Sequence, residues 1–251
     1  MSEDMTIEDY LASGGRLTSP GNVPPRYRAE LMRLMAIFID SELAGAAGFA
    51  DAINLGPGVK ERIAAARIVL EKTHHAEKVL RVMGEFGANT DRYATHHPWT
   101  ERLPRDAAPG DRRPNADMRL MALNYPLAGW SDAVMMNLLM GLAVTETLAD
   151  YQGLSYQPLA EAFREIRPVE QRHAELALEG LQKLRGDDDT LQASANYWWP
   201  KVSASFGIGD TGRDTQLRRF GLRKSTNAEL HDRWQAKAAD TLRSLGLSAP
   251  S

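Results

Sequence analysis

The chain has 251 residues, of which 43% are hydrophobic and 25% are charged, and its formal net charge is -3. Such a composition is typical of a folded globular protein with material for a sizeable core, and it excludes a chain that is disordered throughout. Because the net charge is so close to zero, the chain as a whole has no electrostatic attraction to nucleic acid or to an anionic membrane. We therefore predict no nucleic-acid partner and no membrane partner.

The absence of cysteine narrows the possible chemistry. Disulfide bonds, thiolate catalysis and iron–sulfur clusters held by this chain are excluded, so any bound metal must use histidine and carboxylate ligands. The first twenty residues lack the basic start and apolar run of a secretory signal, and no stretch of about 18 apolar residues occurs. We expect the protein to be cytoplasmic.

Four long helices are predicted by apolar residues at three- and four-residue spacing between Pro and Gly interruptions. Their expected ranges are 26–53, 59–86, 131–154 and 158–184. The third is apolar on almost every side, which is typical of a central helix. In the second, the spacing is carried by Ile63, Ala66, Leu70, Val79, Leu80 and Val82.

About 40 residues with several prolines separate the second and third helices, which is the size of a crossover between helix pairs. Two further helical segments are expected at about 190–206 and 227–245, and Thr226 with Glu229 makes a capping-box start for the last one. The sequence therefore predicts an all-α fold: a ferritin-like four-helix bundle with a long crossover between helices 2 and 3 and additional C-terminal helices. We expect a single domain over residues 1–251, with a core bundle of about 26–186 and an extension of about 187–251.

Glutamate and histidine recur on the predicted bundle helices in a particular order. In ferritin-like di-iron proteins, two helices each give one Glu and the other two each give a Glu-x-x-His pair, all directed into the core. Residues i and i+3 share a helix face, so each pair could bind on one side of a metal site. The residues of this chain that follow the order, and that we predict as metal ligands and catalytic centre, are Glu42, Glu71, His74, Glu146, Glu170 and His173.

Helix geometry tests whether these ligands can meet. Glu42 and Glu71 each lie roughly 18 to 20 Å from the turn between their helices, so they can meet. Glu146 lies roughly 12 Å and Glu170 roughly 18 Å from the second turn, a mismatch of about one helical turn. A shifted boundary could absorb it, and so could the bend that Pro168 should cause just before Glu170.

The alternative is that these residues are surface side chains that match by coincidence. With 16 Glu and 6 His in 251 residues, roughly 0.4 Glu-x-x-His matches are expected by chance. Glu42 and Glu146, however, interrupt apolar stretches, where an unpaired buried carboxylate is costly and a metal removes the cost.

Two residues lie beside the predicted ligands on the same helix, His75 and Arg67. His75 points about 100° away from His74 around the helix, so we expect it outside the ligand set. Arg67 lies one turn before Glu71 and could pair with a ligand carboxylate, or form an ordinary helix salt bridge.

Three segments outside the metal pattern resemble the catalytic alpha subunit of phenylacetyl-CoA epoxidase, the PaaA family, over nearly the whole chain. They are Asn124-Tyr125-Pro126 with Trp130 and Asp132; Tyr197-Trp198-Trp199-Pro200 with Phe206-Gly207; and Lys224-Ser225-Thr226-Asn227 with Glu229-Leu230. The resemblance implies a ferritin-like enzyme that uses O2 and reductase-supplied electrons to epoxidise the ring of an aryl-acetyl-CoA thioester, together with a non-catalytic companion subunit. It also implies metal ligands at Glu42, Glu71, His74, Glu170 and His173.

The chain departs from that family near the metal positions. Arg67 stands where a lysine is typical, Met140 where an acidic residue is typical, and Glu146 where an amide is typical. These departures leave open an oxygenase of the same fold with a different substrate, biosynthetic or not bound to CoA.

Four carboxylates and two imidazoles favour iron, with manganese as the alternative. We therefore predict a di-iron monooxygenase that epoxidises or hydroxylates an aromatic acyl-CoA such as phenylacetyl-CoA, uses two Fe ions and O2, and takes electrons from a separate NAD(P)H-dependent reductase. A homo- or hetero-oligomer with a companion ferritin-like subunit is expected.

A non-catalytic ferritin-like structural or iron-storage subunit is the alternative from another class. The basic group expected to bind CoA phosphates, unless it is only a solvated patch, is Arg218, Arg219, Arg223 and Lys224.

Overall fold

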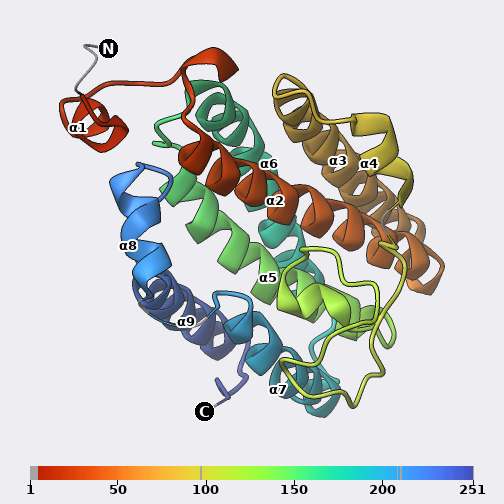
Figure 1. Cartoon of the computed structure of the whole chain (residues 1–251). Coiled ribbons are helices and arrows are strands. Elements are labelled where there is room, and N and C mark those ends of the chain that lie inside the picture. The colour runs from red at the N-terminus through yellow and green to blue at the C-terminus, as the bar shows by residue number, and fades with distance from the viewer. Residues whose placement is uncertain (1–4, 97, 208, 210, 251) are drawn as a thin grey trace.

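The computed structural model describes residues 5–96, 98–207, 209 and 211–250. Within these residues the secondary structure is helical, and the one β-type pairing is an isolated bridge between Leu17 and Tyr156. The four longest helices run diagonally across the molecule in Figure 1 and form the bundle. They are α2 (Pro25–Ala52), α3 (Val59–Gly84), α5 (Trp130–Tyr151) and α6 (Gln157–Lys183). The prediction of an all-α, ferritin-like bundle is confirmed.

The ends of these helices follow from local chemistry, and each lies within three residues of its predicted position. Pro25 opens α2, because its fixed φ and missing N–H are suited to a first helical turn. Gly58 immediately precedes α3, and α3 packs against α2. Pro168 lies inside α6, and the helix continues past it to Lys183.

Shorter helices complete the fold. They are α1 (Ile7–Ala12), α4 (Thr90–His96) in the crossover, α7 (Asp188–Ala204), α8 (Gly212–Arg219) and α9 (Asn227–Ser244). The predicted capping box of Thr226 and Glu229 begins α9. The sequence did not predict α8, which begins with a second capping box, made by Thr211 and Asp214 after a glycine-rich turn.

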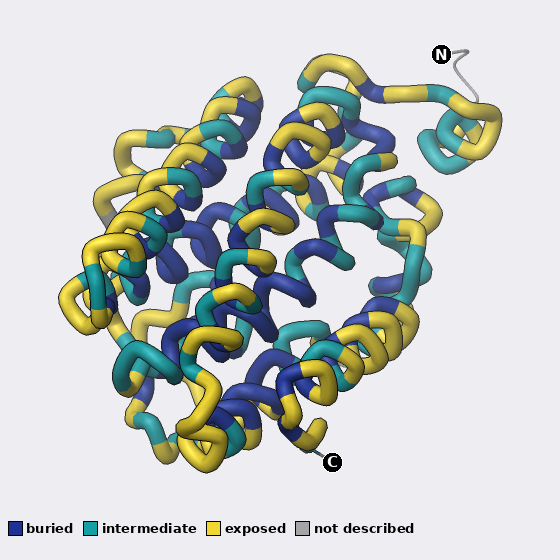
Figure 2. The backbone as a smooth tube through the Cα atoms, turned by 180° about the vertical axis from the view of Figure 1, so that it is seen from behind, coloured by how far each residue is buried: buried dark blue, intermediate teal, exposed yellow. Residues whose placement is uncertain are grey.

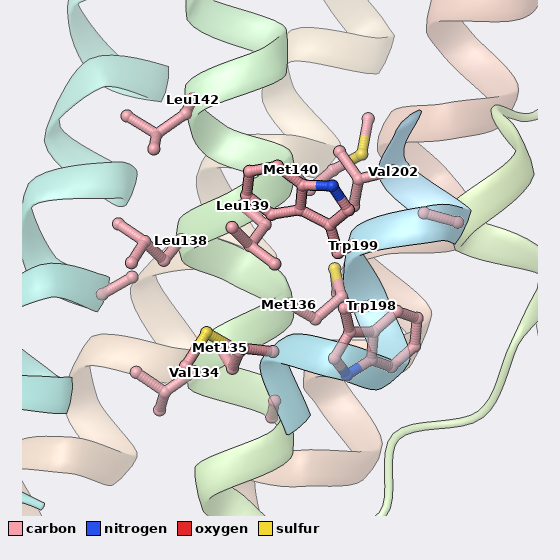
Figure 3. Packing of buried hydrophobic residues seen from close by; sticks show 14 of the residues in the cluster. Val134, Met135, Met136, Leu138, Leu139, Met140, Leu142, Trp198, Trp199 and Val202 are labelled. Atoms are coloured by element: carbon pink, nitrogen blue, oxygen red, sulfur yellow. The ribbon is translucent and has the colours of Figure 1, made fainter. Parts of the chain in front are cut away.

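Helix α5 lies at the centre of the molecule, with α6, α7 and α9 packed against it. Figure 3 shows Trp198, Trp199 and Val202 of α7 beside the methionines of α5. Helix α5 is long and apolar enough to cross a membrane, but 78% of its most apolar window is buried inside the protein. Helix α5 therefore has the burial expected of a core helix, and Figure 2 shows the dark blue of buried residues concentrated in the interior of the molecule.

Three buried aspartates tie the crossover and the C-terminal segments to the bundle. Each accepts hydrogen bonds from a distant part of the chain, which satisfies a carboxylate that would otherwise be costly to bury. The donors are Tyr93 and the Met118 amide for Asp40, Arg105 and Trp198 for Asp132, and the Lys224 and Ser225 amides for Asp150. Several of the family-like segments therefore have structural roles.

Candidate metal centre

The inward face of α3 determines which of its side chains reach the bundle centre. Its buried residues follow steps of three and four: Ala65, Ile68, Lys72, His75 with Ala76, Val79 and Val82 with Met83. Because 3.6 residues make one turn, this series forms a single stripe. Lys72 and His75 lie on the stripe, so α3 directs a Lys-x-x-His pair toward the core.

An ammonium group lies between two carboxylates at the centre of the bundle. Lys72 Nζ is 3.1 Å from Oε1 of Glu42, on α2, and 3.0 Å from both oxygens of Glu170, on α6. Both carboxylates are almost fully buried, with 3% and 1% of their surface exposed. Three helices are therefore joined by one lysine, in a region where water cannot screen the charges.

The imidazole of His75 lies beside the same carboxylates. Its Nδ1 is 3.1 Å from Oε2 of Glu42 and 3.0 Å from Oε1 of Glu170. Burial alone would lower the pKa of His75, but the hydrogen bonds with Glu170 and Glu42 outweigh it and raise the pKa to about 9. At neutral pH the Nδ1–H group therefore donates to the carboxylates from a charged ring.

Lys72 and Glu170 hold each other in the charged form. Burial opposes charge on both groups, yet the attraction of Glu170 and Glu42 raises the pKa of Lys72. Burial likewise favours the neutral form of Glu170, and the charge of Lys72 overcomes it and keeps the pKa of Glu170 well below its usual value. Two cations, Lys72 and His75, thus balance two anions, Glu42 and Glu170.

His173 extends the cluster toward the surface. Its Nε2 is 2.6 Å from Oε2 of Glu71, whose side chain is 32% exposed. Its Nδ1 is buried without a hydrogen-bond partner, because the Glu170 oxygen 3.4 Å away is outside hydrogen-bonding geometry. That orphaned nitrogen is available to a metal ion near Glu170.

The structure brings together only part of the predicted ligand set. Glu42, Glu170 and His173 are buried together, and Glu71 reaches them from the edge through His173. His74, which was predicted as a ligand, is exposed on α3. His75, which was expected outside the ligand set, occupies the inward position. The reason is the helix phase: the prediction placed Glu71 and His74 inward from their Glu-x-x-His spacing, whereas the buried stripe of α3 runs through Ile68, Lys72 and His75.

Glu146 lies away from the cluster. Its carboxylate is 3.2 Å from Nζ of Lys237 and 3.6 Å from Nε of Arg233, both on α9. The side chains that α5 directs toward the cluster include Asn137, Met140 and Val144. Among the described residues, α5 therefore gives the cluster no carboxylate.

A small cavity separates α5 from the cluster. It measures about 30 Å³ as space for the centre of a water molecule, and it is bounded by Lys72, Glu42 and Met140 among others. One water needs roughly 10 to 15 Å³ by this measure, so the cavity has room for about two waters. A phenyl ring would need side chains to move.

The remaining predicted residues lie on the surface or are engaged elsewhere. Arg67 is exposed on α3 and does not reach the cluster. Arg223 is partly buried, with its guanidinium 3.3 Å from the Tyr151 hydroxyl and 3.6 Å from Asp214. Arg218, Arg219 and Lys224 are exposed.

The residues present fit one metal ion better than two. Glu42, His75 and Glu170 each offer a ligand atom within 4.8 Å of the others, so this buried group could hold one ion. A second site of the usual ligand set needs a Glu-x-x-His pair on α3 and a carboxylate on α5. Lys72 and Met140 occupy those places, so a di-iron centre would need Lys72 to leave the carboxylates and would lack a carboxylate from α5.

One family of known proteins matches the sequence of this chain. The sequence profile of the phenylacetic acid catabolic proteins (PaaA/PaaC) matches residues 17–251. That profile spans both the PaaA and the PaaC type of subunit. A search of curated proteins found no significant match. Because the profile covers nearly the whole chain, the protein belongs to the phenylacetic acid catabolic protein family.

Proposed function

We propose that this chain is a non-catalytic, ferritin-like subunit of a phenylacetyl-CoA oxygenase-type complex, acting in the cytoplasm, whose bundle centre is held together by ion pairs in place of a metal pair. The observation that carries the proposal is the position of Lys72, 3.0 to 3.1 Å from oxygens of both Glu42 and Glu170. An ammonium at that place satisfies the carboxylates that a metal ion would otherwise bind.

Charge balance supports this function. In a di-iron site, four carboxylates match the charge of two divalent ions. Here Lys72 and His75 already neutralise Glu42 and Glu170. A divalent ion must therefore compete for these carboxylates with Lys72, whose buried charge would be left without a partner if the ion displaced it.

The small cavity supports it as well. An oxygenase of aromatic thioesters must seat a ring beside its reactive centre, in a pocket that excludes water. The space next to Glu42 and Met140 measures about 30 Å³ and holds only about two waters.

A second candidate is the di-iron or single-iron monooxygenase of an aromatic acyl-CoA such as phenylacetyl-CoA. It is favoured by the orphaned Nδ1 of His173 and by the Glu42, His75 and Glu170 group. In that function a bound iron supplies O2 activation with electrons from a reductase. Lys72 would have to leave the carboxylates, and Arg218, Arg219 and Lys224 would be the candidates for the CoA phosphates.

Metal content decides between the two. The chain is produced with excess iron, and iron and manganese per chain are measured together with thioester-dependent O2 consumption in the presence of an NAD(P)H reductase. We expect no stoichiometric metal and no O2 consumption. About two irons per chain, with O2 consumption accelerated by phenylacetyl-CoA, would establish the monooxygenase.

A designed variant makes the test symmetrical. Lys72→Glu with Met140→Glu gives α3 a Glu-x-x-His pair and α5 a carboxylate, which completes the ferritin-like ligand order. We expect this double variant to bind iron or manganese that the natural chain does not. Lys78→Glu with Met140→Glu is the matched control, because it adds the same charges on the same helices while Lys72 stays in place. Equal metal binding by both double variants would contradict the role given to Lys72.

A further inference from the structure

The outward face of α3 carries an apolar stripe that the described part of the chain leaves largely exposed. Of the five large hydrophobic residues exposed among those described, four lie on or just before this helix: Leu55, Val59, Ile63 and Leu70. Val59 is 73% exposed, and Ile63 and Leu70 are each 56% exposed. With exposed Ala66 between them, they follow steps of four, three and four and form one line roughly 16 Å long.

The rim of the stripe is basic. Lys60, Arg62 and Arg67 are exposed beside it. The nearby acids are directed to other groups: Glu61 is 3.6 Å from Lys183, and Glu71 is 2.6 Å from His173. An apolar line with a positive border is complementary to an apolar line with a negative border.

This charge pattern disfavours a second copy of the chain. Two copies of α3 packed antiparallel about the centre of the stripe would bring Arg62 of one copy near Arg67 of the other. Parallel packing would bring Arg67 near Arg67. Like charges at the border oppose an isologous contact, whereas an acidic partner would neutralise them.

The stripe also lies next to the buried cluster. Glu71 stands between the outward and inward faces of α3, partly exposed and bonded to His173. A partner helix seated on Ile63 and Leu70 would pass close to Glu71 and would shield it from water. The side chain of Glu71 therefore lies between the outward stripe of α3 and the buried cluster.

We infer that the outward face of α3 is the docking surface for a different protein subunit, one that presents an apolar helix bordered by acidic side chains. This inference rests on the proposed function for the kind of partner: a non-catalytic subunit acts by binding the metal-containing subunit of the same family.

The test measures binding of the full-length chain to the purified metal-containing subunit of the same family from the same organism, by sedimentation velocity and calorimetry. We expect Ile63→Glu and Leu70→Glu to weaken binding at least about tenfold, because each places a charge in the apolar contact. Arg67→Glu should weaken it too and should reduce its salt dependence. Matched controls are Met5→Glu, an exposed apolar residue away from α3, and Arg219→Glu, an exposed arginine of α8.

Three outcomes would overturn the inference. They are unchanged binding by the Ile63 and Leu70 variants, self-association of the natural chain that these variants abolish, and binding to vesicles of anionic phospholipid that they abolish. Unchanged thermal melting shows that each variant is folded. Metal content is measured on the same samples: stoichiometric iron in the natural chain would refute the proposed function, while unchanged binding by the variants would refute the docking surface alone.

Discussion

The two faces of α3 are both apolar, but they differ in what they contact. The inward face packs Ala65, Ile68 and Val79 into the bundle and places Lys72 and His75 among buried carboxylates. The outward face is a stripe of aliphatic residues without such contacts and with a basic border. One helix therefore carries a buried charge cluster on its inward face and four of the large exposed hydrophobic residues on or just before its outward face.

This difference shows that hydrophobic periodicity indicates a contact surface but does not indicate whether the partner is the same chain or another one. A stripe with helical spacing indicates a surface that is covered, either by the same chain or by another one. On α3 the more conspicuous aliphatic stripe faces outward, while the inward stripe includes a lysine and a histidine. Variants on each face separate the two roles.

The largest effect is expected at the centre of the cluster. Lys72→Met removes the ammonium between Glu42 and Glu170 and leaves the two buried carboxylates with the single positive charge of His75. Breaking a buried charge cluster in this way costs about 3 to 5 kcal/mol of unfolding free energy. Denaturation by urea, followed by circular dichroism, measures the loss.

The same helix offers a control at its surface. Lys78 pairs with Glu165, but their side chains are 42% and 66% exposed. Water and salt screen such a pair, so Lys78→Met should change the unfolding free energy by at most about 1 kcal/mol. Equal losses for the two variants would show that Lys72 does not hold a buried cluster together.

A pH effect of intermediate size is expected from His75. Its pKa is raised to about 9 in the folded chain, against about 6.5 in the unfolded chain. The stabilisation is therefore complete below about pH 6.5 and disappears as the pH rises through about 9, and its size is on the order of 3 kcal/mol. The measurement is the difference in unfolding free energy between the natural chain and His75→Gln from pH 6 to pH 10, with a chelator present. A difference that does not vary with pH would mean that His75 is neutral in the cluster.

The sequence was sufficient to predict the bundle. Pro25, Gly58 and the capping box of Thr226 with Glu229 are local signals, so the helix ends could be predicted from neighbouring residues. The burial of Glu42 followed from its place in an apolar stretch. These features depend on short-range chemistry, which a single sequence contains.

The composition of the site depended on the orientation of two helices, and that was harder to predict. On α3 two apolar stripes compete, and only the spacing of Ala65, Ile68 and Val79 separates the buried stripe from the exposed one. A charged Lys72 on the buried stripe hid this signal. Periodicity could not orient α5 at all, because the helix is apolar almost all round.

The calculated mismatch in depth between Glu146 and Glu170 was the signal that the sequence did contain. A ligand on α5 at the same depth as Glu170 would lie about one turn before Glu146. Met140 lines the cavity beside Glu170, about a turn and a half before Glu146. The mismatch reflected a real separation, since Glu146 contacts α9 through Lys237.

The smallest effect on stability is expected on the outward face, and the comparison is between two isoleucines of α3. Ile63 is 56% exposed and Ile68 is 4% exposed. Ile63→Ala should change the unfolding free energy of the isolated chain by no more than about 0.5 kcal/mol, whereas Ile68→Ala should cost about 2 to 5 kcal/mol because it leaves a cavity. Urea denaturation of both variants tests this. A large loss at Ile63 would mean that the chain itself covers the stripe, and a small loss with weakened subunit binding is what an interface residue should show.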